Sequence, residues 1–591
     1  MFLTSLMTAQ AQQFTIDGLT YTVYRGDMVS VTSDWLSFTL RDTVPVPEYV
    51  TYSGETYHVT RLKDWAFYQQ LGMKHITLPP SIHEISENCF YQSGLKSIDF
   101  PAGLNCIREA AFYGTRIDSI TIPSTVANIE EQAFFLNQSH QKFEVEQGNS
   151  HYCAVDGVLY SADTTLLHSY PAGKRDTAFH VPEGVTRIAT GAFGGNSHLR
   201  HVYLPGSVTE ISNMAFVQCS NMVRINIPEN AAISGNPFAW CPSLTDIVID
   251  SGNHHVTFLP DNHALVSADG DTLFHMLPAD GILTVPEGVR FIAPYALAYH
   301  FREYGIVVGE GVEEMDRCAC FNSNYKTVTL PSSLWKIGEE CFGHCYRLNT
   351  LNLSEGLTDM GNAAFYFCAT LPRVSLPNSL KRVPDGAFYQ CMDLEDVTFG
   401  DSTEYIGVQS FFNCGLSLTE PITFPSTLVH IGDSAFEGTR LTAVEFTGEI
   451  DSIGEGAFLV DDPGISAITL VQQVPPRTGE GAFKFDKDYT IYIPCGSDRN
   501  YRTAPHWRDY DNYVTDCEGA DEVKEEPTRV YADRGCVVVC GAEGRQVEVY
   551  NAMGVRVAQG HAANDCQQYP VPAKGLYLVR VGHETRKVVV M

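Results

Sequence analysis

The sequence predicts a parallel β solenoid of stacked coils followed by a small β-sandwich. The first reason is a short apolar strand and a proline that return every 22–25 residues. The second is an Ala-Phe pair, or a near substitute, that marks each repeat; the third is the loss of this period after an acidic stretch near the C-terminus. One unit of about 23 residues cannot bury its own apolar face, so this period indicates stacking.

The marker pair defines the register of the array. In chain order it stands at Ala66-Phe67, Cys89-Phe90, Ala111-Phe112, Ala133-Phe134, Ala192-Phe193, Ala215-Phe216, Pro237-Phe238, Ala296-Leu297, Cys320-Phe321, Cys341-Phe342, Ala364-Phe365, Ala387-Phe388, Ser410-Phe411, Ala435-Phe436, Ala457-Phe458 and Ala482-Phe483.

One repeat shows how a coil should form. Val374 and Leu376 alternate with polar residues, as in a strand with one buried face. Pro377 cannot donate a ladder hydrogen bond and ends the strand. Ala387-Phe388 then closes the coil with a large ring beside a small residue. Stacked coils of this kind align their strands into a parallel sheet.

Two inserts interrupt the array, near residues 144–180 and 250–284. Phe134 to Phe193 and Phe238 to Leu297 both span 59 residues, which is one repeat plus an insert. Asp156-Gly157 predicts a hairpin turn, so we expect each insert to be a β-hairpin projecting from the solenoid. Such a hairpin either binds a ligand or only caps a local irregularity. The equal spacings of 104 residues across the inserts indicate a duplicated block.

The ends of the chain depart from the repeat. Residues 1–13 resemble the end of a signal peptide, with an unstructured N-terminus as the alternative, and residues 14–56 alternate as an N-terminal β cap. The solenoid is expected over 57–495 and a C-terminal cap containing Trp507 over 496–515. Residues 516–527 form an acidic linker, and the short β-rich segments of 528–591 predict an Ig-like sandwich.

Composition narrows the possible partners. The chain has 39 basic and 70 acidic residues, a formal charge of −31, which disfavours nucleic acid and anionic membranes. There is no apolar run long enough for a transmembrane helix.

The 17 cysteines divide into two groups. Most follow the repeat and read as small core residues; Cys219, Cys241, Cys345, Cys368, Cys391 and Cys414 stand three residues after the marker phenylalanine or its equivalent. No zinc-type spacing is present. Cys495 and Cys517 could pair, and the pairing of Cys536, Cys540 and Cys566 stays open.

The repeat resembles the BspA-like (treponemal-type) leucine-rich repeat family, most closely at residues 201–219 and 327–345. This resemblance implies a secreted or cell-surface protein that binds host or bacterial surface proteins or glycans. The elements Val547–Val557, Gly575–Val581 and Lys587–Val590 resemble the C-terminal sorting domain of the type IX secretion system of Bacteroidota. That second resemblance implies type IX machinery as a partner and export through the periplasm to the outer-membrane surface or the extracellular space.

No catalytic motif is found, so the sequence predicts a protein that is not an enzyme and has no cofactor or metal. Outward positions of the predicted sheet supply the candidate ligand-binding residues His75, His201, Tyr203, Arg224, Asn226, Arg373 and Ser375. The leading hypothesis is non-covalent adhesion or recognition across this sheet. An inert surface-layer or spacer protein, or a targeting module for a partner enzyme, remains the alternative.

Overall fold

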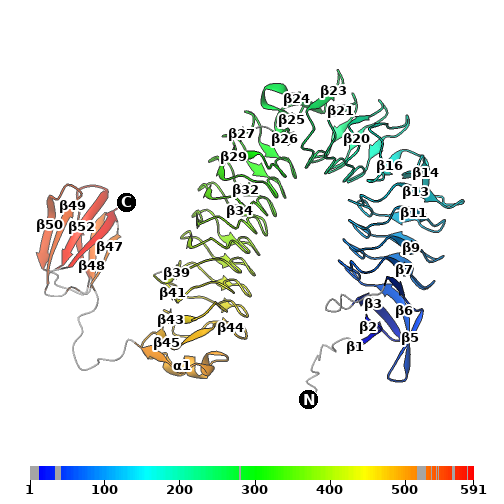
Figure 1. The fold of residues 1–591 in the computed structure, drawn as a ribbon. Coiled ribbons are helices and arrows are strands. Elements are labelled where there is room, and N and C mark those ends of the chain that lie inside the picture. Colours follow the sequence, from blue (N-terminus) through cyan, green and yellow to red (C-terminus); the bar gives the residue numbers. More distant parts are fainter. Residues whose placement is uncertain are drawn as a thin grey trace, which may run out of the picture. The chain divides into compact units, whose positions relative to one another are not determined.

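The structure is a computed structural model that describes residues 12–33, 42–278, 281–418, 420–515, 528–533, 535–540, 542, 545–561, 566–581 and 584–590. The chain divides into two compact units, Met1–Ile491 with Asn500–Asn512, and Tyr492–Arg499 with Tyr513–Met591. The stacked coils belong to the first unit (Figure 1). Within the described residues, no helix has the length and apolar character needed to span a membrane.

The N-terminal segment forms a mostly antiparallel sheet of order β1-β2-β3-β6-β5, in which only β3 and β6 run parallel. The strands are β1 (Gln13–Ile16), β2 (Leu19–Arg25), β3 (Met28–Ser33), β5 (Tyr49–Tyr52) and β6 (Glu55–Leu62). Their buried residues, such as Tyr21 and Val31, join the core of the first coils. The first coil strand, β4 (Thr43–Pro45), already pairs with β7 (His75–Thr77), inside the segment expected to be cap.

The longer strands of the coils form a first series of parallel sheets, which we together call the front sheet. Their central residues point inward, as Ile76 of β7 does. After β4 and β7 come β9 (Ser97–Asp99), β11 (Ser119–Ile122), β13 (Lys142–Val145), β17 (Ala178–His180), β19 (His201–Tyr203), β21 (Arg224–Ile227), β23 (Asp246–Ile249), β27 (Gly281–Thr284), β29 (Glu303–Val307), β31 (Thr327–Thr329), β33 (Thr350–Asn352), β35 (Arg373–Ser375), β37 (Asp396–Thr398), β39 (Ile422–Phe424), β41 (Ala443–Phe446), β43 (Ile465–Thr469) and β45 (Phe485–Ile493).

Two-residue strands form a second series of parallel sheets, the side sheet. They are β8 (Glu84–Ile85), β10 (Cys106–Ile107), β12 (Asn128–Ile129), β18 (Arg187–Ile188), β20 (Glu210–Ile211), β22 (Ala232–Ile233), β28 (Phe291–Ile292), β30 (Glu314–Met315), β32 (Lys336–Ile337), β34 (Asp359–Met360), β36 (Arg382–Val383), β38 (Tyr405–Ile406), β40 (His430–Ile431), β42 (Ser452–Ile453) and β44 (Arg477–Thr478). The second residue of each strand is the apolar one in nearly every coil, and it is buried.

A third set of backbone hydrogen bonds runs along the marker loops, which we call the loop side. The Phe388 N–H donates to the Ser410 carbonyl of the next coil at 2.8 Å. Left-handed residues flank the ring on both sides, Gly386 with φ 62° and Gln390 with φ 55°. Their N–H groups also donate to the next coil, at 2.8 and 2.7 Å. This loop conformation, with a left-handed residue on either side of the ring, thus pairs backbone N–H groups that a buried loop would otherwise leave without an acceptor.

The marker phenylalanines stack inside the coils. Phe365, Phe388 and Phe411 follow one another with ring centroids 5.4 Å apart and interplanar angles of 5° and 10°. All three rings are fully buried. The predicted ring ladder is confirmed here, and it carries much of the core between neighbouring coils.

Two positions of the ladder differ from the sequence prediction. The pair Cys320-Phe321 was expected to be the marker, but the Leu297 N–H bonds the Ala319 carbonyl and the Cys320 N–H bonds Cys341. Cys320 therefore takes the ring position and Phe321 lies one residue outside the core. Tyr170 was missed: its N–H bonds the Ala192 carbonyl at 2.7 Å, and it stacks on the next marker ring. Hydrogen-bond register, which the sequence does not display, decides both positions.

The cysteines three residues after the marker ring are buried and free. Each donates its S–H to the carbonyl of the ring residue one coil earlier, as Cys219 does to Phe193 and Cys391 to Phe365, both at 3.2 Å. Burial raises the pKa of the Cys345 thiol to about 12, so it stays protonated. These residues are core groups with one satisfied donor, as the sequence predicted, and they are not reactive thiolates.

Both inserts contain the predicted antiparallel hairpin, but they do not project. β14 (Tyr152–Val155) pairs with β15 (Val158–Ser161), which pairs with β16 (Leu166–Ser169), and β16 joins the side sheet through β18. Val158, Leu159 and Tyr160 are buried on both faces of the hairpin. A hairpin with two apolar faces gains more by intercalating between coils than by standing in solvent.

The second insert repeats this arrangement. β24 (Val256–Leu259), β25 (Ala264–Ser267) and β26 (Thr272–Met276) are antiparallel, with a short 3-10 helix η1 (Pro260–Asn262), and β26 pairs in parallel with β28. The duplicated block predicted from the spacing is thus visible in the topology.

Each insert acts as a wedge. It adds strands to the side sheet, while on the loop side the flanking coils touch directly. At the second insert the Trp240 and Tyr299 rings stack at 5.1 Å and the Asn236 amide donates to the Tyr295 carbonyl at 2.7 Å. The array bends over this stretch (Figure 1). Phe135, Val217 and Ala239 form a separate hydrophobic cluster.

The predicted short helix and strand follow the last coil in the chain, as α1 (Asp498–Thr503), η2 (Trp507–Asp509) and β46 (Tyr513–Thr515). Trp507 is buried and its indole N–H donates to the Pro476 carbonyl at 2.8 Å. The ring covers Phe483, the last marker residue, at a centroid distance of 5.6 Å. Without such a cap the final coil would expose its apolar end.

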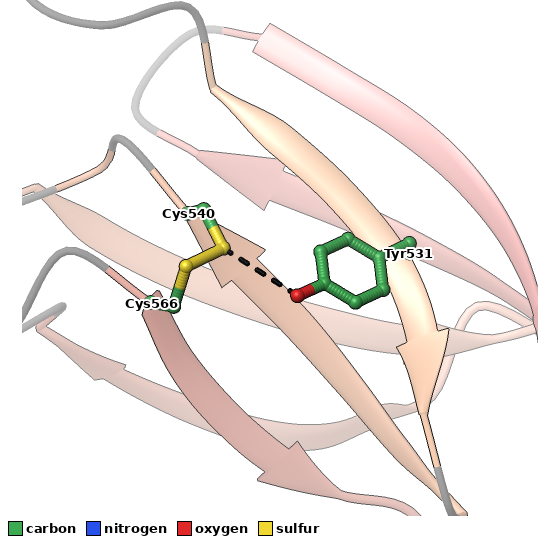
Figure 2. The surroundings of a disulfide bond; sticks show 3 residues. All are labelled: Tyr531, Cys540 and Cys566. Atoms are coloured by element: carbon green, nitrogen blue, oxygen red, sulfur yellow. Dashed lines mark hydrogen bonds between the residues drawn. A yellow bond between two sulfur atoms is a disulfide. The ribbon is translucent and has the colours of Figure 1, made fainter.

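The C-terminal unit has two antiparallel sheets, β47-β48-β51 and β50-β49-β52-β53, around one hydrophobic cluster. The strands are β47 (Arg529–Asp533), β48 (Cys536–Cys540), β49 (Gln546–Asn551), β50 (Arg556–His561), β51 (Cys566–Pro570), β52 (Gly575–Val581) and β53 (Glu584–Val590). Cys540 and Cys566 form a disulfide between facing strand positions, with the Tyr531 hydroxyl 3.8 Å from Cys540 Sγ (Figure 2). Cys536 is free, Cys495 is disulfide-bonded, and Cys517 lies outside the described residues.

Candidate ligand-binding surface

All seven residues predicted from the sequence lie at outward positions of the front sheet. They are the first or third residues of their strands, and the residue between them is buried in every case: His75 on β7, His201 and Tyr203 on β19, Arg224 and Asn226 on β21, and Arg373 and Ser375 on β35. Alternation of the strand backbone fixes this orientation.

The structure places four of the seven, His201, Tyr203, Arg224 and Asn226, on the neighbouring strands β19 and β21. β17, β19, β21 and β23 are neighbours, and the register places His201 opposite Arg224. Tyr203 is exposed at 38% and stacks on His180 of β17, with ring centroids 4.3 Å apart and an interplanar angle of 11°. His201, Tyr203 and Arg224, with His180, therefore form one patch of rings and charge, which we call the front patch.

Arg224 and Asn226 are held differently. The Arg224 guanidinium donates to Asp246 Oδ2 at 2.7 Å, and both side chains are close to half exposed. The Asn226 amide instead bonds the backbone of Leu204, accepting from its N–H at 2.8 Å and donating to its carbonyl at 2.9 Å. The Asn226 side chain thus pairs with the backbone as a neighbouring strand would, and both polar atoms of its amide are already hydrogen-bonded.

The other predicted residues lie on separate strands of the front sheet. His75 is held by Ser97 Oγ at 2.8 Å and Asp99 Oδ2 at 3.2 Å, both from the next coil. Arg373 and Ser375 are exposed on β35, which pairs only with β37 in its sheet. Neither His75 nor the pair on β35 contacts the front patch. The sequence therefore predicted the outward positions correctly, but it did not show which of them lie close together.

His180 is the functional candidate that sequence reasoning missed. It ends β17 and precedes Val181-Pro182, so it stands at the position that Tyr203 occupies before Leu204-Pro205 in the next coil. The strand followed by a proline is the sequence signal that His180 shares with Tyr203. The first insert breaks the marker-pair spacing just before this strand, so the spacing alone does not reveal His180.

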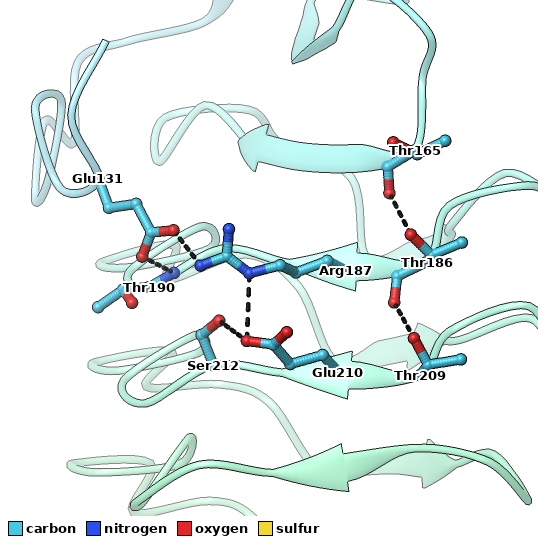
Figure 3. A network of polar contacts seen from close by, with 8 residues as sticks. All are labelled: Glu131, Thr165, Thr186, Arg187, Thr190, Thr209, Glu210 and Ser212. Atoms are coloured by element: carbon cyan, nitrogen blue, oxygen red, sulfur yellow. Dashed lines mark hydrogen bonds and ion pairs between the residues drawn. The ribbon is translucent and has the colours of Figure 1, made fainter. Parts of the chain in front are cut away.

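A second polar network lies on the side sheet at the first insert (Figure 3). The Arg187 guanidinium bonds Glu131, across the insert, and Glu210 of the next coil, with Nε 3.2 Å from Glu210 Oε1. The other Glu131 oxygen accepts the Thr190 N–H at 3.0 Å. Ser212 Oγ donates to Glu210 at 3.3 Å. Arg187 therefore fills the gap between the two coils that flank the insert.

The electrostatics of this network fit a permanent ion pair. Partial burial raises the pKa of the Glu131 carboxyl, but the hydrogen bonds from Thr190 and the charge of Arg187 outweigh it and leave that pKa below its ordinary value. The pKa of Arg187 is held above its ordinary value because attraction to Glu131 and Glu210 outweighs the cost of burial. No cluster of metal-binding type occurs within the described part of the chain.

The comparisons with known proteins agree with this architecture. The model for the BspA type leucine rich repeat region matches six copies, over residues 56–152, 173–259, 313–420 and 387–497. The chain belongs to this family. The unmatched stretches, 153–172 and 260–312, hold most of the two inserts. Residues 518–590 match a domain of unknown function, DUF6383. No curated protein matches the chain.

Several solved structures of bacterial proteins are similar to this chain. A leucine rich cell surface protein of Faecalibacterium prausnitzii A2-165 is 22% identical, with 66% of this chain and 94% of that chain covered and a TM-score of 0.37. The pneumococcal vaccine antigen PcpA is 16% identical over 85% and 97%, with a TM-score of 0.30. A leucine-rich repeat protein of Bacteroides ovatus ATCC 8483 is 19% identical over 85% and 99%, with a TM-score of 0.28.

Proposed function

We propose that this protein is an exported surface protein that recognises a protein or glycan ligand non-covalently through its front sheet. The observation that carries the proposal is the front patch, where an exposed stacked pair, His180 and Tyr203, lies beside His201 and Arg224. Membership of the leucine-rich repeat family supports a recognition role.

The patch is suited to capture because it is already ordered. Stacking fixes the Tyr203 ring, and Asp246 fixes the Arg224 guanidinium. A ligand then meets aromatic faces and a directed donor without paying to immobilise long side chains. A tyrosine ring adds apolar contact area and a polar hydroxyl, which serves either a sugar face or a protein side chain.

A binding screen of the full chain against matrix proteins and glycans tests this proposal. A ligand found there should lose at least tenfold in affinity when Tyr203→Ser and Arg224→Ser are combined. Arg373→Ser is the matched control on a separate strand and should leave affinity within twofold. A ligand insensitive to the double change, or no ligand at all, would favour the spacer alternative.

We further propose that the protein acts without catalysis. The repeats occupy most of the chain, and a repeat surface suits binding rather than chemistry. A role as targeting module would require a partner enzyme, which co-purification from the native host would reveal.

We propose that the C-terminal β-sheet domain, residues 528–591, directs export of the chain through the type IX secretion system. Its disulfide between Cys540 and Cys566 supports folding in an oxidising compartment outside the cytosol. Deleting residues 527–591 should leave a folded array that stays in the periplasm of a host with that system. Equal surface display of the full and truncated chains, measured by fractionation, would refute this role.

A further inference from the structure

The second insert leaves a cleft on the side sheet. The cleft has a volume of about 360 Å³, and Gly235, Thr272, Phe291, Pro294, Glu314 and Asp316 are among the residues that line it. It lies between the coil that precedes the insert, at β22, and the coil that follows it, at β28.

The duplicated block shows what this place holds in the first copy. Across the spacing of 104 residues, Phe291 corresponds to Arg187 and Glu314 to Glu210. The strand registers agree, because Arg187 faces Glu210 between β18 and β20 and Phe291 faces Glu314 between β28 and β30. The cleft is therefore the counterpart of the space occupied by the Arg187 guanidinium.

The contacts that hold Arg187 in the first copy, which we call the Arg187 clamp, are all missing from the second copy. Glu131, which bonds both Arg187 and the Thr190 N–H, corresponds to Gly235, which carries no carboxylate. Thr190 corresponds to Pro294, which has no N–H to donate. The guanidinium, its acceptor and the backbone donor have thus all disappeared, while the acidic residue on the far wall has stayed.

The acidic wall is stronger in the second copy. Ser212 corresponds to Asp316, so this wall of the cleft carries two carboxylates, Glu314 and Asp316, where the same wall of the first copy carries the Glu210 carboxylate and a hydroxyl. Lys336 lies 3.3 Å from one oxygen of Glu314 and offsets part of that charge. The lining residues themselves include no cation.

We propose that this cleft binds the guanidinium of an arginine side chain presented by a partner protein. The ligand takes the place that Arg187 fills in the first copy, with its guanidinium against Glu314 and Asp316. The Phe291 ring supplies a stacking face for a planar cation, as it already does for Arg290, whose guanidinium lies 5.0 Å from the ring centroid. Arg290 itself is neutralised by two hydrogen bonds to Glu313.

Arginine is favoured over lysine by the shape of the site. Two carboxylates two residues apart, Glu314 in β30 and Asp316 just after it, and a flat ring match a planar fork of donors, whereas an ammonium is a compact point charge. The strongly acidic chain, with a net charge of −31, also attracts basic partners over longer distances. The proposal concerns the side sheet and does not depend on binding at the front patch.

Saturation-transfer NMR on the full chain with N-acetyl-arginine methylamide tests the proposal. The neutral citrulline analogue, which keeps the shape and lacks the charge, and the lysine analogue are the matched ligands. The arginine ligand should bind at least tenfold more tightly than the citrulline ligand and more tightly than the lysine ligand. Equal binding of arginine and citrulline would overturn the proposal.

Three variants locate the site. Phe291→Arg installs the residue of the first copy and should abolish binding by filling the cleft. Glu314→Gln and Asp316→Ser, the latter also taken from the first copy, should each weaken binding at least fivefold. Tyr203→Ser on the front patch should have no effect. Undiminished binding in Glu314→Gln and Asp316→Ser would place the ligand elsewhere and overturn the assignment, whether or not Phe291→Arg folds.

Discussion

The two insert blocks, residues 129–219 and 233–323, share one backbone plan and differ in how their side chains close it. In both, a hairpin joins the side sheet and the coils before and after the insert also contact each other directly, at what we call the junction. The first block closes that junction with Arg187 between two glutamates, and the second leaves a cleft. The wedge is therefore built by the apolar strands, and the polar residues at the junction are free to change function.

The ring ladder gives the largest expected difference between the blocks. Phe193 is fully buried between Tyr170 and Phe216. In the second block, Leu297 stands in place of Phe193 and Cys320 in place of Phe216. Phe193→Ala should lower the free energy of unfolding by about 3–5 kcal/mol because it leaves a cavity. Phe193→Leu, the residue of the second block, should cost less. Equal losses in the two variants, measured by denaturant unfolding, would show that the ring itself does not matter.

A buried histidine gives the next difference. Burial lowers the pKa of His140 to about 3, and the second block has Leu244 at this position. The unfolded chain takes up a proton below about pH 6.5 that the folded chain excludes, so stability falls as the pH drops below that value. Between pH 7 and pH 5, wild-type protein should lose about 2 kcal/mol more than His140→Leu.

Chemical denaturation at both pH values checks this. A pH dependence that is unchanged in the leucine variant would mean that His140 is protonated in the folded state.

We expect the Arg187 clamp to contribute less to the free energy of unfolding than the two features above. Arg187→Ala should cost about 1–2 kcal/mol, toward the lower value because solvent screens the partly exposed pair. The pKa of Glu131 is lowered, so this contribution is present above about pH 4.3 and is lost as the pH falls through the lower folded value.

The difference in stability between wild type and Arg187→Ala should therefore shrink under acid conditions. Phe291→Ala, at the open junction, is the control and should show no such trend. A cost for Arg187→Ala that does not change with pH would contradict the ion pair.

The thiol position gives the smallest effect. Cys219 donates to the Phe193 carbonyl, and Ser323 makes the same bond to Leu297 at 3.1 Å in the second block. Cys219→Ser should therefore change the free energy of unfolding by less than about 1 kcal/mol, while Cys219→Ala loses the donor and costs more. Thermal unfolding that ranks serine below alanine would argue against the shared bond.

The repeat period was enough to predict the coils, the parallel sheets, the buried rings such as Phe388 and the outward direction of His201 and Arg224. These features depend on alternation along one strand, which a sequence displays directly. The register of Cys320, the ring position of Tyr170 and the intercalated hairpins depend on hydrogen bonds between coils. The Arg187 clamp and the cleft at Phe291 depend on contacts across an insert, so only the folded chain reveals them.

Counting bound ligands tests the central claim, that one junction carries its own guanidinium and the other receives one from outside. Equilibrium dialysis of labelled N-acetyl-arginine methylamide measures ligand bound per chain in three proteins. The account predicts one site in wild type, two in Arg187→Ala, where the first junction is emptied, and none in Phe291→Arg. The same number in all three proteins would contradict it.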